Sequence, residues 1–146
     1  MKHIFMMALA AMFMFTLASC ASSGDVSYVE ARNYFHNNNA PVPANIKITT
    51  QSEFDSQFGM ATTMGEDGKP TPIDFEKQFV LAKVLPVTDV ATEISPVSLK
   101  KQDGQLQLTY AVKMGEKMSY SMQPIMILIV DNKYKNLEVK EIQQKQ

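Results

Sequence analysis

A strict alternation of side chains between Gln105 and Met114 constrains the fold of this chain more than any other feature. Apolar residues occupy every second position there, at Leu106, Leu108, Tyr110, Val112 and Met114. Successive side chains of a strand point to opposite faces, so this period of two predicts a strand with one buried and one solvated face. The preceding Asp103-Gly104 is typical of the tight turn of a hairpin. A sheet that water reaches on one face is typical of antiparallel pairing.

Other segments are predicted to add strands to this sheet. The run 79–85 is apolar enough for a central strand, and 125–130 is apolar throughout, which suits a buried strand. The alternation over 92–99 is weaker and is broken by Pro96, which predicts a bulge or an edge strand. Shorter elements are predicted at 46–48 (strand), 137–140 (strand, followed by a polar tail) and 28–35 (strand or short helix).

One short helix is predicted directly after the strand at 46–48. Thr50-Gln51-Ser52-Glu53 has the spacing of a capping box, in which hydroxyl and carboxylate satisfy free backbone amides. Phe54 and Phe58 are four residues apart and therefore share one helical face, and Gly59 is placed to cap the helix end. The fold class that follows is α+β, a mainly antiparallel β-sheet with one short helix packed on it.

Two longer segments are predicted to be loops. Residues 61–74 hold prolines and glycines with little apolar periodicity. Glu66 and Asp67 lie in this segment without the regular ligand spacing of a calcium site, which predicts a solvated turn. Residues 115–124 are predicted to link the alternating strand to the apolar strand that follows.

The N-terminus carries a second kind of signal. A cationic start is followed by an apolar run at 4–15 and by Leu17-Ala18-Ser19-Cys20. This pattern resembles the lipobox of bacterial lipoproteins, which implies diacylation of Cys20 and removal of residues 1–19 as a signal peptide. Residues 20–27 are then a flexible tether, and 28–146 form a single globular domain. The alternative is a non-lipidated signal peptide or a hydrophobic helix with a chance cysteine.

The residues after Cys20 bear on the localisation of the protein. Ala21 stands where an acidic residue retains some lipoproteins in the inner membrane, so the outer membrane is favoured. The segment has no acidic run led by Lys or Gln of the kind that resembles a surface-export tag. We therefore expect a lipid-anchored protein of the cell envelope, on the outer membrane and facing the periplasm rather than the cell surface.

Composition excludes most familiar catalytic designs. Cys20 is the only cysteine, and once His3 leaves with the signal, His36 is the only histidine. Thiol nucleophiles, disulfides and His-based zinc sites therefore lack their residues, and no Gly-x-Ser-x-Gly motif is present. The formal net charge of −1, with no basic block, argues against nucleic acid as a partner. We expect a protein that is not an enzyme and needs no cofactor; carboxylate-only chemistry remains open, with no residues to name.

Three features are candidates for a binding site. Met114, Met118 and Met122 repeat at intervals of four, and soft thioethers of this kind bind Cu(I); methionine is equally a filler of cores. Tyr120 lies between two serines, either exposed as an anchor for a partner or packed back on the sheet. His36, followed by three asparagines, is either a polar recognition patch or a turn.

Part of the chain is similar to a known family. The segments Phe79–Val84, Leu106–Tyr110 and Gln123–Ile127 resemble the protease-complex accessory (PrcB-like) domain, while Pro86–Asp89 stand in place of its Thr-Gly-Gly-Tyr turn. The whole chain also resembles small uncharacterised lipoproteins of Bacteroides-type bacteria. The first resemblance implies a non-catalytic protein that binds, stabilises or inhibits an envelope protease. The alternative function is a periplasmic binder of copper or of a small ligand that uses a Met-rich loop.

Overall fold

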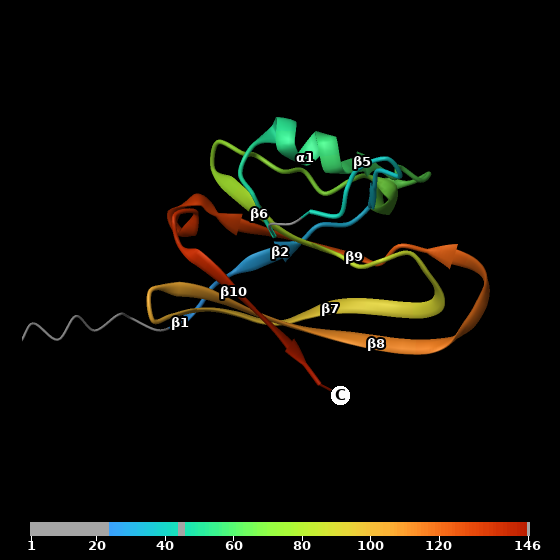
Figure 1. Ribbon diagram of the computed structural model, residues 1–146. Coiled ribbons are helices and arrows are strands. Elements are labelled where there is room, and N and C mark those ends of the chain that lie inside the picture. The colour runs from blue at the N-terminus through green and yellow to red at the C-terminus, as the bar shows by residue number, and fades with distance from the viewer. Residues whose placement is uncertain (1–23, 44–45, 146) are drawn as a thin grey trace, which may run out of the picture.

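The computed structural model describes residues 24–43 and 46–145. Its strands form two four-stranded sheets, sheet A in the order β1-β7-β8-β10 and sheet B in the order β2-β9-β6-β4, and a two-stranded ribbon of β3 and β5. Figure 1 shows that sheet B lies between sheet A and a third layer made by the ribbon and α1. The prediction of an α+β fold, mainly antiparallel with one short helix, is confirmed. Among the described residues, no helix is long and apolar enough to cross a membrane.

The elements follow one another in a simple order along the chain. The bounds are β1 (Gly24–Asp25), β2 (Tyr28–Glu30), β3 (Tyr34–His36), β4 (Lys47–Ile48), α1 (Gln51–Gln57), β5 (Phe58–Met60), η1 (Glu66–Gly68), β6 (Gln78–Val84), β7 (Thr88–Gln102), β8 (Gln105–Met122), β9 (Ile125–Asp131), η2 (Asn132–Tyr134) and β10 (Glu138–Gln144). The segment 28–35, left open between strand and helix, contributes the strands β2 and most of β3.

Two apolar cores explain why β6 is apolar over residues 79–82 and β9 over residues 125–130. The first core fills the space between the sheets, with Phe79, Leu81, Met126 and Leu128 of sheet B facing Ile94, Leu99, Leu106 and Leu108 of sheet A. The second core lies on the other face of sheet B, with Val80, Ala82, Val84 and Ile127 against Ile48, Phe54 and Phe58. A strand that is buried on both faces needs no polar side chains, so the usual alternation disappears.

The hairpin of β7 and β8 is built around the predicted turn. Asp103 and Gly104 both have positive φ angles, 53° and 73°, and join the paired residues Gln102 and Gln105. Positive φ at both central positions is the backbone of a type I′ turn, whose twist matches that of the strands. The register of β7 shifts between Pro96 and Ser98, which confirms the predicted bulge.

Replacing Gly104 with valine is expected to lower the free energy of unfolding by about 1–2 kcal/mol, because the left-handed region is costly for a residue with a Cβ. The space around Gly104 is open, so the cost comes from the backbone and not from a clash. Urea unfolding of the purified protein measures it. Gly24→Val is the control, since Gly24 also has free space and lacks a positive φ. Equal destabilisation by the two variants would contradict the turn assignment.

The helix α1 begins as predicted and ends differently. Thr50 is the N-cap, and its hydroxyl accepts a hydrogen bond of 3.2 Å from the backbone N–H of Glu53. Gly59 is not the C-cap, because the chain is already extended at Phe58 and continues as β5, paired with β3. Gly59 instead lies under the ring of Phe35, which would have to move if residue 59 carried a Cβ.

Three boundaries also differ from the predictions, each because strand pairing extends an element. Residues 115–122 are not a loop but the second half of β8, paired with β7 through register shifts that local periodicity does not show. The polar tail after residue 140 continues β10 to Gln144, which pairs in parallel with β8. At the N-terminal side, residues 24–27 were placed in the tether, yet Gly24 pairs with Lys101 and Val26 is 4% exposed.

One ion pair joins the two sheets at the rim of the first core. Lys83 of β6 lies 3.1 Å from a carboxylate oxygen of Glu141 of β10, and its ammonium lies 5.7 Å from the ring centroid of Tyr110. Burial alone would lower the pKa of Lys83, but the hydrogen bond and charge of Glu141 outweigh it and raise that pKa. Lys83 therefore stays charged while its stem packs along the core.

Candidate functional site

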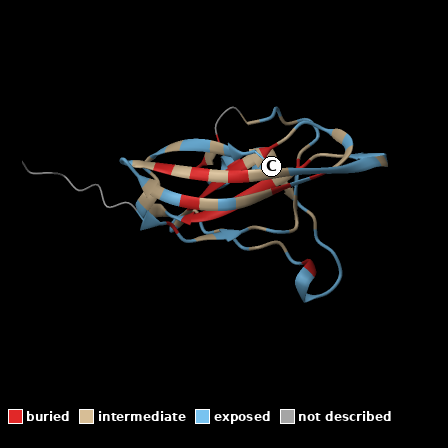
Figure 2. Ribbon diagram, turned by 90° about the horizontal axis from the view of Figure 1, so that it is seen from below, coloured by how far each residue is buried: buried red, intermediate tan, exposed pale blue. Residues whose placement is uncertain are grey.

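The second half of the β7–β8 hairpin is the most exposed part of sheet A. In β8 the buried and half-buried positions alternate up to Ala111, whereas nearly every residue from Lys113 to Ser121 is exposed. Figure 2 shows this end of the hairpin as a pale blue ribbon that extends past the other strands. We call residues 88–92 and 113–122 the hairpin tip; they form the open end of the hairpin, opposite to the Asp103-Gly104 turn. The β8 part of the tip is exposed on both faces, which distinguishes it from the rest of the sheet, whereas Thr92 in the β7 part is buried.

Within residues 24–43 and 46–145, no strand pairs with either outer edge of the hairpin tip. On the β7 side, β1 pairs only with Lys100 and Lys101. On the β8 side, β10 pairs only with residues from Gln105 to Ala111. Among the described strands, none therefore pairs with the outer edge of β8 beyond Ala111. Such an edge presents free backbone N–H and C=O groups to any extended chain that approaches it.

A shallow hollow of about 350 Å³ lies against the hairpin tip. Its lining residues are Ala91, Thr92, Glu93, Lys113, Gly115, Met118, Tyr120 and Met122. Tyr120 is 65% exposed and stands on a strand, so the predicted exposed aromatic is present although the predicted loop is not. Exposed tyrosines beside apolar hollows are common anchors in protein interfaces.

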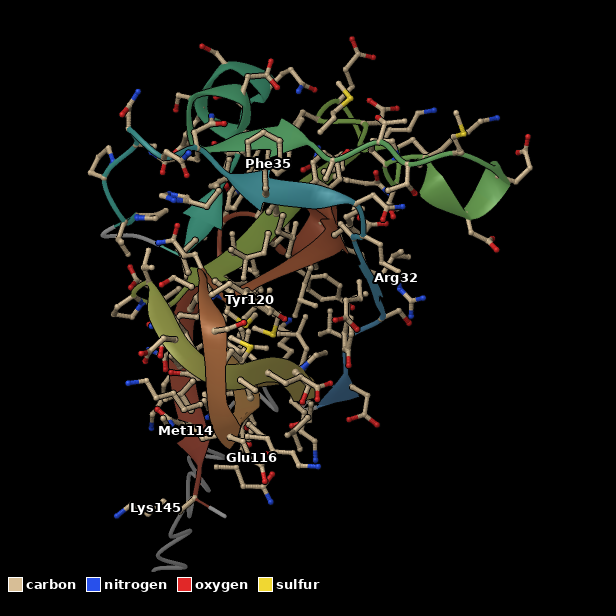
Figure 3. The ribbon with its side chains drawn as sticks, turned by 90° about the vertical axis from the view of Figure 1, so that its right-hand side faces the viewer. Arg32, Phe35, Met114, Glu116, Tyr120 and Lys145 are labelled. Carbon is tan, nitrogen blue, oxygen red and sulfur yellow. The ribbon has the colours of Figure 1, made fainter. Side chains whose placement is uncertain are left out.

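The three methionines predicted as a group are separated by a bulge in β8. Met114 pairs with Thr92, and Lys117 pairs with Val90. Between these two pairs β8 therefore contains one more residue than β7. An extra residue reverses the face on which the later side chains lie. Met118 and Met122 accordingly share the hollow with Tyr120, whereas Met114 is outside it and 67% exposed. Figure 3, which faces this end of the molecule, shows Met114 and Tyr120 on separate stretches of β8. A Cu(I) site would have two of its three predicted ligands here.

The charges of the hairpin tip are balanced. Lys117 lies 3.3 Å from a carboxylate oxygen of Asp89, with both side chains largely in solvent. Glu93 and Lys113 are paired across the two strands. Exposed pairs of this kind contribute little to stability. The tip itself holds two acidic side chains, Asp89 and Glu116, and two basic ones, Lys113 and Lys117, so it has no net charge to steer a charged partner.

His36 is placed inside the protein and not on a recognition surface. It is 6% exposed, with Nδ1 3.1 Å from the side-chain oxygen of Gln123 and Nε2 3.3 Å from that of Gln57. Its ring packs edge-on against Phe58, with 5.8 Å between the centroids. The prediction of His36 as a partner-binding residue is therefore not supported, because two amides and a phenyl ring already occupy its surface. Asn38 and Asn39 do form the alternative predicted for this segment, a turn, which the hydrogen bond from the Ala40 N–H to the Asn37 oxygen closes.

In residues 24–43 and 46–145, no group of three or more His, Cys, Asp or Glu side chains could hold a metal ion. Four hollows on the surface each contain one carboxylate, at Asp25, Asp55, Glu93 and Asp131. General acid–base catalysis by two carboxylates needs both in one site, and none of these hollows provides the second.

The lipid-attachment motif Leu17-Ala18-Ser19-Cys20 lies outside the described residues. The chain reaches the fold at Gly24, which pairs with Lys101 close to the Asp103-Gly104 turn. The predicted anchor therefore enters at the end of the hairpin opposite to the tip. In Figure 1, β1 lies on the left and the hairpin tip lies on the right.

Comparisons with known proteins add no relative to this picture. The resemblance of the C-terminal half to the PrcB-like domain stays a prediction. No protein family, curated protein or solved structure was found to match this chain.

Proposed function

We propose that this protein is a non-catalytic lipoprotein of the cell envelope that binds another protein through the hairpin tip. The observation that carries the proposal is the exposed second half of β8, whose outer edge pairs with no described strand beyond Ala111. An extended segment of a partner can pair with the free edge of β8 beyond Ala111 and so continue sheet A. Its side chains then alternate, and every second one reaches the hollow that contains Met118, Tyr120 and Met122.

The two parts of such an interface have different roles. Backbone hydrogen bonds to the β8 edge contribute affinity with little regard for sequence, because every residue except proline offers an N–H. Contacts with Tyr120 and the two thioethers contribute specificity, since methionine adapts its shape to the group it meets. The balanced charges of the tip favour a partner segment that is itself close to neutral.

The position of the anchor supports the same function. Cys20 is four residues before Gly24, so even a fully extended chain places its lipid within about 14 Å of the first strand. The 18 residues of β8 span about 55–60 Å if fully extended, and bulges shorten this somewhat. A lipid at Cys20 therefore leaves the hairpin tip at the end of the protein far from the bilayer, free to meet a partner in the aqueous space.

The compartment and the class of partner follow from the predictions made on the residues themselves. The lipobox resemblance and Ala21 favour the outer membrane, facing the periplasm. The resemblance to the PrcB-like domain makes an envelope protease the partner of choice. An extended segment added to a sheet edge is also the way in which many proteases hold polypeptide chains, so an accessory or inhibitory role suits this geometry.

Photocrosslinking in cells tests the proposal. With p-benzoylphenylalanine in place of Tyr120, we expect one defined adduct, because a benzophenone there lies in the proposed interface. The same group at Gln102, which is exposed near the opposite turn, is expected to give none. In parallel, Tyr120→Ala should lower recovery of that partner by about tenfold or more, as interface anchors do.

Val97→Ala is the control for the alanine variant, because Val97 is an exposed apolar residue of the same hairpin outside the hollow. It is expected to leave partner recovery unchanged. Full recovery of the partner with Tyr120→Ala would refute binding through the hairpin tip. Adducts of equal yield from positions 120 and 102 would refute it as well.

A further inference from the structure

A second hollow lies in the third layer, remote in the chain from the hairpin tip. It has a volume of about 360 Å³ and lies between α1, β5 and the segment that follows η1. Its lining residues are Tyr34, Gln51, Phe54, Asp55, Phe58, Gly59, Met60, Pro70, Pro72 and Ile73. Gln51 and Asp55 are the only lining residues with an amide or a carboxylate, and Tyr34 contributes one hydroxyl. Such a hollow, apolar with few polar groups, is the usual form of a specific binding site.

The apolar part of this hollow is held rigidly. Phe54 packs against Phe58 with 5.1 Å between ring centroids, and Tyr34 meets Phe54 edge-on at 5.2 Å. The hydroxyl of Tyr34 donates a 2.6 Å hydrogen bond to the backbone oxygen of Thr71, which ties the segment 70–73 to the ribbon. The hollow is therefore formed before any ligand arrives, and binding would not require its walls to be ordered.

Asp55 supplies a negative charge to the lining. Its Oδ1 accepts a 2.7 Å hydrogen bond from Gln51, one turn earlier on α1. Among the described residues, no lysine, arginine or histidine forms an ion pair with Asp55 and no donor is bonded to its Oδ2. Burial, followed by the charge of Asp55, raises the pKa of Tyr34, which lines the same hollow. The hollow thus combines an apolar body with one uncompensated carboxylate.

We propose that this hollow binds the side chain of an arginine on a partner polypeptide. The three methylene groups of arginine would pack against Met60 and the two prolines, and the guanidinium would meet the carboxylate of Asp55. Arginine fits better than lysine because its planar group forms directed hydrogen bonds to carboxylates and stacks on aromatic rings. The site is independent of the hairpin tip, so either proposal can fail without the other.

Two-dimensional NMR of the ¹⁵N-labelled protein tests this site with three probes. The first is acetyl-Ala-Arg-Ala-amide, the second is its citrulline analogue, which keeps the shape and lacks the charge, and the third is agmatine. We expect the arginine peptide to shift amides of residues 51–60 and 70–73 in a saturable way. The citrulline peptide is expected to bind at least about fivefold more weakly, because the cation loses its carboxylate partner.

Asp55→Asn is expected to abolish the difference between the arginine and citrulline peptides. Asp67→Asn is the matched control, since Asp67 is an exposed carboxylate in η1 outside the hollow, and it should preserve the difference. The dispersion of the amide spectrum verifies that both variants are folded. Equal binding of the two peptides by the unaltered protein, or shifts centred elsewhere, would overturn the proposal. Binding of agmatine as tight as that of the arginine peptide would overturn the assignment to a polypeptide.

Discussion

Replacing Cys20 with serine is expected to abolish incorporation of labelled palmitate completely, because the thiol is the only group of its kind in the chain. Each buried methylene of an acyl chain contributes about 0.8 kcal/mol to membrane binding, so several chains on one residue make a durable anchor. Loss of that anchor should move the protein from the detergent phase to the aqueous phase in phase partitioning. Radiolabelling and partitioning of cell extracts measure the two effects separately.

Ser22→Ala is the matched control, since it changes a small polar residue just after the predicted acylation site. It should retain both the label and the detergent partitioning. The fold itself is expected to be unaffected by Cys20→Ser, because the cysteine precedes Val26, the first core residue. Retention of the serine variant on membranes after a high-salt wash would mean that an uncleaved signal or protein contacts hold it there.

The parts of the fold that could be predicted are those that local sequence patterns determine. The alternation of Leu106, Leu108 and Tyr110, the turn at Asp103-Gly104 and the cap at Thr50 each depend on neighbours within a few residues. Their structures were predicted correctly because local preference and tertiary packing agree there. The apolar runs of β6 and β9 were also recognised as buried strands, although the second core that covers their other face was not foreseen.

The parts that were missed depend on partners far away in the chain. Gly24 and Asp25 form a strand only because they pair with Lys101 and Lys100. Gln144 likewise belongs to a strand only because it pairs with Ala111. Residues 115–122 have no clean period of two, since bulges in the hairpin interrupt it. Short pairings and bulges of this kind leave almost no trace in a single sequence.

The candidate sites show the same division. The sequence left Tyr120 open between an exposed position and packing on the sheet, and the structure places it in the exposed position. The interval of four among Met114, Met118 and Met122 suggested a shared face, which holds for a helix but fails on a bulged strand. The hollow beside α1 gave no signal, because its residues come from three separate segments that only the fold brings together. Its one local hint is Asp55 on the exposed side of a helix whose Phe54 is buried.

The largest effects on stability are expected where a strand is buried on both faces. Leu128 faces the core between the sheets and Ile127 faces the core beneath α1, although the two are adjacent. Truncation of either to alanine is expected to lower the free energy of unfolding by about 2–5 kcal/mol, the range for leucine and isoleucine in cores. Urea unfolding followed by circular dichroism measures each value.

Leu108 and Thr109 of β8 are the matched pair, because sheet A has water on its outer face. Leu108 is 0% exposed and Thr109 is half-buried, so Leu108→Ala should cost as much as the β9 variants while Thr109→Ala should change stability by less than about 1 kcal/mol. The three-layer fold thus predicts that alanine at either of two adjacent positions in β9 lowers stability strongly. In β8, alanine lowers it strongly at Leu108 and little at the adjacent Thr109. A tolerant Ile127→Ala would mean that α1 and the β3–β5 ribbon do not cover sheet B, and the hollow beside α1 would lose its wall.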